Sequence, residues 1–176
     1  MASRSIDIRQ LPLLLLPLAL SACGPTRTSP PAPPPAPPAA PVQQPVHSGD
    51  WRDWPLTPGT WRYVPGTPIS SARYGDGSAV QFIVECDSAL RRVTLMRAGS
   101  ATEIAIITST RIARFPAGHV EREGAAMTGV ILAASDAFLD VMAFSRGRIA
   151  VQSPGLLSLA IPTWAEPARA IEDCRK

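Results

Sequence analysis

Apolar and polar residues alternate along much of the chain beyond residue 60, which is typical of half-buried β-strands. Val80, Phe82, Val84 and Cys86, for example, fall on one face of such a strand, so Cys86 is expected to point inward. Turn-forming residues separate the alternating segments. The pattern predicts strands over residues 60–64, 69–74, 79–86, 91–97, 103–109, 110–115, 126–132, 148–152 and 156–161.

Glycine-containing turns indicate how neighbouring strands connect. Residues 75–78, Gly-Asp-Gly-Ser, separate the second and third predicted strands, and glycine readily adopts the positive φ of a tight hairpin turn. Residues 98–100, Ala-Gly-Ser, separate the fourth and fifth strands and predict another hairpin. A further turn is expected at residues 116–118, Pro-Ala-Gly, with His119 in it.

Two segments near the C-terminus follow helical spacing instead. In residues 135–144 the apolar positions form the stripe of a short helix, with Ser135 or Asp136 as its N-cap. Thr163-Trp-Ala-Glu166 has the form of a capping box and predicts a helix running toward Cys174. We therefore expect an α+β domain, mainly antiparallel β, built as a small sandwich or partial barrel with two short helices.

Composition divides the chain into three parts: a leader over residues 1–22, a linker over residues 23–46 and a globular domain over residues 47–176. Every Trp, Tyr and Phe lies in the third part, whose length suits one domain with a real core. That part carries 14 basic and 13 acidic residues without a block of either sign. Nucleic acid is therefore not expected as a partner.

The leader places a positive segment, with Arg4 and Arg9, before an apolar run that is too short to span a bilayer. It ends in Leu20-Ser-Ala-Cys23, which resembles the lipobox of bacterial lipoproteins. The resemblance implies that Cys23 is acylated and becomes the first mature residue, and Gly24 favours the periplasmic face of the outer membrane. The membrane is then a partner through the lipid anchor. The alternative is a plain secretory signal, with Cys23 incidental.

The linker over residues 24–46 contains ten prolines, one charged residue and no aromatic residue. Proline fixes φ and lacks an N–H, so the segment favours polyproline II rather than helix or sheet. Fully extended, it would reach about 70 Å. We interpret it as a semi-rigid spacer; the alternative is a docking site for a proline-binding module.

With Cys23 assigned to lipid, Cys86 and Cys174 remain as a pair. In an oxidising periplasm, two such cysteines in a small domain predict a disulfide. Metal binding or redox chemistry would call for flanking histidines or closely spaced cysteines, and the sequence has neither. We expect no metal and no cofactor.

Candidate binding residues occur in two short segments. Trp51, Trp54 and Trp61 cluster where the linker meets the domain, either as an exposed aromatic row or folded back onto the core. Arg146 and Arg148 flank a glycine, either to hold an anion or simply as solvated side chains. We keep Trp51, Trp54, Arg146 and Arg148 as a possible binding surface.

The sequence gives weaker evidence for an enzyme than for a binding protein. The sequence has no G-x-S-x-G, H-E-x-x-H or glycine-rich phosphate loop. Asp136 and Asp140 suit a glycan hydrolase in principle, although helix capping also explains Asp136. His119, with Glu121 and Glu123, suggests either a metal site or an exposed hairpin tip.

The C-terminal third resembles small periplasmic domains of the invasion-associated locus B kind. The shared pieces are Phe144–Arg148, Leu157–Leu159 and Ile171–Cys174, which fall within residues 144–174 and include no catalytic motif. The resemblance brings no reaction with it. We therefore expect a lipid-anchored envelope protein that acts as a binding, accessory or structural module, with an envelope protein or peptidoglycan as partner. The alternatives are a carboxylate-dependent hydrolase of cell-wall glycans and a lysozyme inhibitor.

Overall fold

The computed structural model describes residue 47 and residues 49–176. The predictions for the leader, the lipidated cysteine and the linker fall on residues 1–46 and lie outside the described residues. Within the described part, neither helix is long and apolar enough to cross a bilayer.

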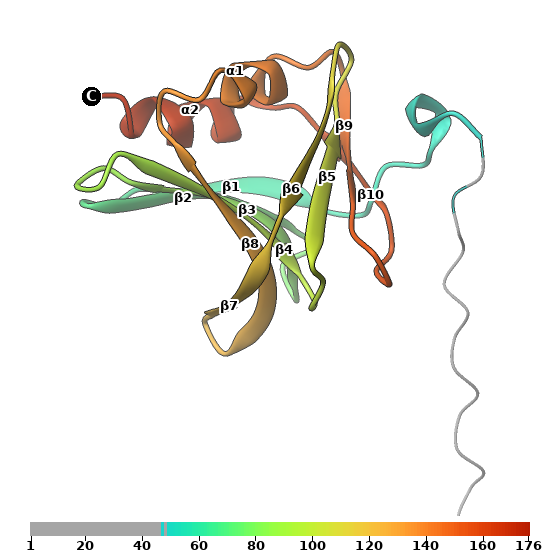
Figure 1. The fold of residues 1–176 in the computed structure, drawn as a ribbon, viewed down its shortest axis with the longest axis horizontal. Helices are drawn as coiled ribbons and strands as arrows, with labels where there is room; N and C mark the ends of the chain where they lie inside the picture. Colours follow the sequence, from blue (N-terminus) through green and yellow to red (C-terminus); the bar gives the residue numbers. More distant parts are fainter. Residues whose placement is uncertain (1–46, 48) are drawn as a thin grey trace, which may run out of the picture. The chain divides into compact units, whose positions relative to one another are not determined.

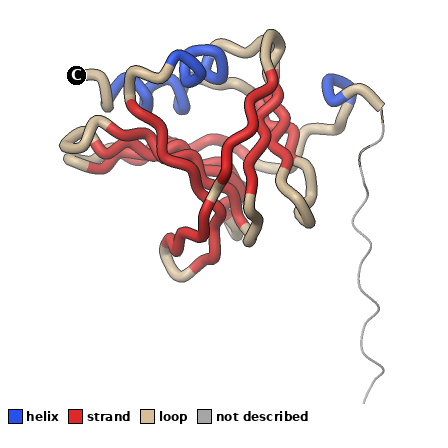
Figure 2. The backbone as a smooth tube through the Cα atoms, in the orientation of Figure 1, coloured by secondary structure: helices blue, strands red, loops and turns tan. Residues whose placement is uncertain are grey.

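Ten strands of the described chain form two antiparallel sheets that pack as a sandwich (Figures 1 and 2). The predicted fold class is therefore confirmed. The first sheet runs, in spatial order, β1 (Thr60–Val64), β2 (Ile69–Gly75), β3 (Val80–Asp87), β4 (Arg92–Ala98), β8 (Ala125–Ala133) and β7 (Gly118–Arg122). The second runs β10 (Leu159–Pro162), β9 (Arg148–Gln152), β5 (Glu103–Ile107) and β6 (Ile112–Pro116).

The two sheets are joined along two sides. On one side only Ala117 separates β6 from β7, so one extended stretch passes from the second sheet into the first. On the other side, Thr57, just before β1, pairs with Ala160 of β10. The Thr57 N–H donates to the Ala160 carbonyl, and the Ala160 N–H donates to Thr57 Oγ1, both at 2.9 Å. These contacts hold the sheets at fixed positions around a shared core.

Two α-helices lie across one end of the sheets (Figure 1). Helix α1 (Ala137–Ala143) begins at Asp136, whose side chain accepts a hydrogen bond from the Phe138 N–H at 2.8 Å, so the predicted cap is confirmed. Helix α2 (Ala165–Asp173) packs against β1, β2 and β3. The capping box predicted for α2 is wrong. Trp164 occupies the N-cap, because the Thr163 hydroxyl instead donates to the Ser145 carbonyl at 2.7 Å.

The hairpin predicted around residues 98–100 is also wrong, because β4 and β5 belong to different sheets. The connecting segment crosses between the sheets and is held against β8. The Gly99 N–H donates to the Ala126 carbonyl at 2.9 Å, and Thr128 Oγ1 bonds both the Gly99 carbonyl and the Ala101 N–H. These bonds satisfy the backbone that a hairpin partner would otherwise occupy.

Strand β7 is a further difference, since the sequence predicts a turn at residues 116–118, with His119 in it, and no strand between residues 115 and 126. It pairs with β8 through a two-residue connection, Glu123-Gly124, with φ values of 54° and 75°. Positive φ at both central residues is the geometry of a type I′ hairpin turn. Asn-Gly or Asp-Gly would have signalled this turn, whereas Glu-Gly does so weakly.

The main core lies between the sheets and under the helices. Trp61, Tyr74 and Phe82 pack edge to face within it, and the Trp61 indole N–H donates to the Pro162 carbonyl at 2.7 Å. Cys86 on β3 and Cys174 after α2 form the predicted disulfide, with their Cα atoms 5.4 Å apart. The disulfide therefore links the C-terminal helix to the core face of the first sheet.

A smaller apolar cluster lies on the outer face of the first sheet and contains Ile83, Met96 and Met127. Val80, expected to face inward, packs against this cluster instead, because the register shifts between Tyr74 and Gly75. A bulge of this kind places neighbouring side chains on faces that simple alternation does not predict.

Candidate binding site

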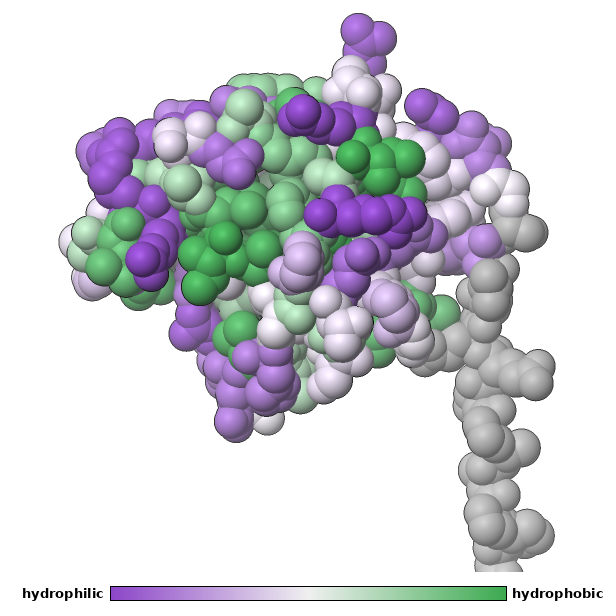
Figure 3. All heavy atoms as spheres, viewed as in Figure 1, coloured by the Kyte–Doolittle hydropathy of each residue, from purple (hydrophilic) through white to green (hydrophobic). Residues whose placement is uncertain are grey.

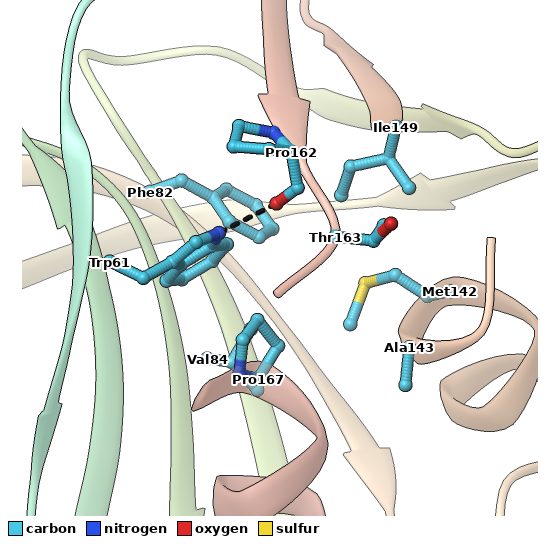
Figure 4. A pocket seen from close by; sticks show the side chains of 9 residues that line it. All are labelled: Trp61, Phe82, Val84, Met142, Ala143, Ile149, Pro162, Thr163 and Pro167. Atoms are coloured by element: carbon cyan, nitrogen blue, oxygen red, sulfur yellow. Dashed lines mark hydrogen bonds between the residues drawn. The ribbon is translucent and has the colours of Figure 1, made fainter. Parts of the chain in front are cut away.

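The gap enclosed by the core is too small for a ligand. Trp61, Phe82 and Met142 are among the residues around it (Figure 4), and its volume is about 10 Å³. That is room for about one water molecule. The gap is better regarded as a packing imperfection than as a site.

A surface hollow of about 510 Å³ has a different character. It is lined by Trp51, Arg52, Ser109, Thr110, Arg146 and Arg148, a set that we call the arginine site. These residues come from the 3₁₀ turn η1 (Trp51–Asp53), the β5–β6 turn, the connection from α1 to β9 and the first residue of β9. Three of the four residues expected to form a binding surface therefore meet in one concavity.

Two serines lock the loops of the site together. The Ser109 N–H donates to Ser145 Oγ at 2.9 Å, and the Arg146 N–H donates to Ser109 Oγ at 3.0 Å. The Ser145 hydroxyl in turn donates to the Arg148 carbonyl at 2.9 Å. Gly147 has a φ of 77°, which lets the chain reverse between the two arginines. The positions of the two arginine backbones are thus set before any ligand arrives.

Trp54, the fourth expected residue, lies beneath the site rather than in it. Its side chain is 6% exposed and packs with Ala150 and Ala160, while Trp51 packs partly buried against the same cluster. Arg148 Nη1 donates to the Trp54 carbonyl at 2.5 Å. The folded-back alternative therefore holds for Trp54, and equally for Trp61 in the main core. Trp54 helps to orient Arg148.

The charges lining the arginine site are all positive. Asp50, at its edge, contacts Arg52 with 3.2 Å between Oδ2 and Nη1. The Arg52 N–H and guanidinium lower the pKa of Asp50. Arg52 also lies over the Trp51 ring, 5.0 Å from its centroid. In the described chain, Arg146 and Arg148 belong to no ion pair.

The carboxylates considered for catalysis have other roles. Asp136 caps α1, as described above, and Asp140 accepts a hydrogen bond from Arg175 at 2.7 Å. Glu123 pairs with Arg73 at 2.5 Å rather than joining His119. His119 lies exposed on β7, not in a turn. The described residues contain no group of three or more His, Cys, Asp or Glu side chains placed to hold a metal ion.

A second large hollow, of about 630 Å³, surrounds Asp173 at the end of α2. Asp173 accepts hydrogen bonds from Tyr63, from Ser70 at 3.0 Å and from Lys176 at 2.8 Å. Burial raises the pKa of Asp173, but these hydrogen bonds outweigh it and lower the pKa below its ordinary value. Because each donor ties α2 to the first sheet or to the chain end, we assign this cluster to stability.

Sequence reasoning missed three members of the arginine site: Arg52, Ser109 and Thr110. A signal existed for the last two, because Ser-Thr-Arg over residues 109–111 is a polar break between two apolar strands. It did not indicate which other loop the turn would face. A comparison with protein-family models, curated proteins and solved structures found no match. Function must therefore be inferred from the chemistry of the site itself.

Proposed function

We propose that this protein is a lipid-anchored component of a bacterial envelope that acts by binding, and that the arginine site is where it binds. The lipobox resemblance at Leu20–Cys23 supports the location, on the periplasmic face of an outer membrane. The proline-rich linker supports a domain held away from the lipid surface. The observation that carries the binding role is the arginine site, where Arg146 and Arg148 line a hollow without an acidic side chain.

A purely structural role explains this hollow poorly. Four other arginines of the described chain, Arg73, Arg114, Arg122 and Arg175, are each paired with a carboxylate, whereas Arg146 and Arg148 are not. Cationic side chains gathered around one concavity repel each other unless an anion joins them. The arrangement is therefore better suited to a ligand than to folding.

The hydrolase and the lysozyme inhibitor remain the competing hypotheses. For the hydrolase, the assigned roles of Asp136 and Asp140 in capping and ion pairing make both carboxylates structurally useful. Turnover of purified peptidoglycan by the full chain, lost in Asp140→Asn, would favour the hydrolase. Inhibition of added lysozyme would favour the inhibitor.

Crosslinking in intact envelopes tests the binding role. The wild-type chain should capture one or more envelope components, and the double variant Arg146→Ala/Arg148→Ala should capture far less. Arg114→Ala is the matched control, because Arg114 is an exposed arginine outside the site, paired with Glu103. Equal capture by all three proteins would contradict the proposed function.

The anchor needs its own test. Replacement of Cys23 by serine should abolish lipid labelling and move the protein from the membrane fraction to the soluble periplasm. Unchanged mass and unchanged membrane fractionation would show that Cys23 is incidental.

A further inference from the structure

We infer that the arginine site recognises a carboxylate carried by a glycan, the chemistry of cell-wall strands whose sugars bear acidic peptide stems. This inference rests on the proposed binding function and adds the class of ligand to it. Three properties of the site carry it: the kind of polar groups it presents, the shape in which they are arranged, and the near-neutral charge of the surrounding domain.

The polar groups that line the site are mainly hydrogen-bond donors. The guanidinium of Arg148 has five N–H donors and spends one on the Trp54 carbonyl. Arg146 is exposed at the rim, and in the described chain its guanidinium forms no ion pair. A site of this kind favours a ligand rich in acceptors, and a planar carboxylate matches the fork of an arginine.

Two hydroxyl side chains, those of Ser109 and Thr110, line the site beside the arginines. Ser109 Oγ accepts from the Arg146 N–H, which leaves its own proton free to donate. Thr110 is exposed beside it in the same turn. Hydroxyls next to a cationic pair suit the ring oxygens and hydroxyls of a sugar, which both donate and accept.

An aromatic wall bounds the other side. Trp51 is half-buried and lines the hollow, and Arg52 lies over its ring. Asp50 offsets the charge of Arg52, so the positive charge available to a ligand is concentrated on Arg146 and Arg148. A sugar ring lying against this wall would place its acidic substituent toward those two residues.

The shape and the net charge of the domain argue against a large polyanion. A membrane surface or nucleic acid binds through a broad basic face. This domain carries 14 basic and 13 acidic residues, and its outer-sheet arginines, Arg73 and Arg122, are paired with glutamates. Arg146 and Arg148 instead line one hollow that has no acidic side chain, and its volume is that of a small-molecule site.

The experiment compares glycan ligands with and without free carboxylates. The purified full chain is titrated with a soluble muropeptide whose peptide carboxylates are free, with the same muropeptide after amidation, and with the neutral dimer of N-acetylglucosamine. We expect the free carboxylate form to bind at least tenfold more tightly than either form that lacks the carboxylates. Arg146→Ala should weaken that binding about ten- to a hundredfold, as expected for loss of a charge-assisted contact.

Two further variants separate recognition from structure. Arg146→Lys keeps the charge but loses the planar fork, so it should restore only part of the affinity. Arg114→Ala should bind like the wild type. Equal affinity for free and amidated muropeptide would overturn the carboxylate inference while leaving the binding function intact.

The remaining outcomes also decide between the two proposals. If no muropeptide binds but envelope crosslinking still depends on Arg146, the ligand is not an acidic glycan and only this inference fails. Preferential binding to vesicles containing anionic lipid would overturn it in favour of a membrane headgroup. If neither crosslinking nor any titration depends on Arg146 and Arg148, both proposals fall.

Discussion

Two pairs of arginines in this domain lie in contrasting surroundings. On the outer face of the first sheet, Arg122 pairs with Glu85 and Arg73 pairs with Glu123. Those contacts fasten the β7–β8 hairpin over the cluster of Ile83, Met96 and Met127. On the face drawn in Figure 3, hydrophilic side chains gather at the tip of this hairpin. The β7–β8 hairpin is therefore held by apolar contacts to this cluster and by two arginine–glutamate ion pairs.

In the arginine site, by contrast, Arg146 and Arg148 are held in place by backbone contacts and meet no acidic side chain of the described chain. The difference indicates that one pair of arginines contributes to stability and the other to ligand binding. A half-buried pair such as Arg122 with Glu85 supports the fold, because removing either partner leaves the other charge poorly solvated. An exposed arginine without a counterion contributes little to folding and remains available to a ligand.

The largest expected effect concerns the disulfide, which joins β3 to the C-terminal end of α2. Replacement of both Cys86 and Cys174 by serine should lower the free energy of unfolding by about 4 kcal/mol, since the closed loop spans many residues. Urea unfolding of the wild type with and without reductant, beside the variant, checks this. Two free thiols in protein taken from the periplasm would contradict it.

The fastening of the β7–β8 hairpin comes next. Arg122→Ala leaves the carboxylate of Glu85, whose side chain is 7% exposed, without its cation. We expect a loss of about 2–3 kcal/mol in the free energy of unfolding. Arg114→Ala breaks an exposed pair and should cost less than about 1 kcal/mol. Equal losses in the two variants would show that burial does not distinguish the pairs.

The Asp173 cluster should show a pH-dependent effect of intermediate size. Replacement of Asp173 by Asn should cost about 1–2 kcal/mol near neutral pH through its weakened hydrogen bonds. Because folding lowers the pKa of this group, its contribution is complete above its ordinary pKa of 3.8 and is lost as the pH falls through the lower folded value. The two unfolding free energies should therefore converge as the pH falls well below 3.8. A constant difference down to pH 2 would contradict the lowered pKa.

The smallest effect on stability is expected in the arginine site. Arg146→Ala should change the free energy of unfolding by less than about 0.5 kcal/mol, because its side chain is exposed and outside any ion pair of the described residues. The same variant should lose ligand binding, so its affinity should fall while its free energy of unfolding stays nearly unchanged. A large loss of stability would place Arg146 with the structural arginines instead.

Local pattern was sufficient for most elements of this fold. Alternation located β1, β3 and β9, and helical spacing located α1 with its Asp136 cap. The number of cysteines and the inward phase of Cys86 predicted the disulfide. The strands and the helix depend on the spacing of residues a few positions apart, and the disulfide depends on the number of cysteines. Both can be read from the sequence without knowledge of distant contacts.

Local pattern failed where a backbone or side chain found a distant partner. Thr163 bonds the α1–β9 connection instead of capping α2, and the segment after β4 bonds β8 instead of turning back on β4. In both cases a turn signal was present, but tertiary hydrogen bonds satisfied the same groups differently. Turn chemistry shows that the chain changes direction and does not show which sheet it joins next.

The sequence by itself therefore determined the class of fold, the disulfide and two of the arginines worth testing. Only the tertiary structure decided that Arg146 and Arg148 share a hollow with Trp51, Ser109 and Thr110, while Trp54 turns inward. The reason is physical: these residues lie on three segments far apart in the chain. They meet because β9 pairs with β5 in the second sheet, because Trp51 and Trp54 pack against Ala150 and Ala160, and because Ser109 and Ser145 bond the two loops together.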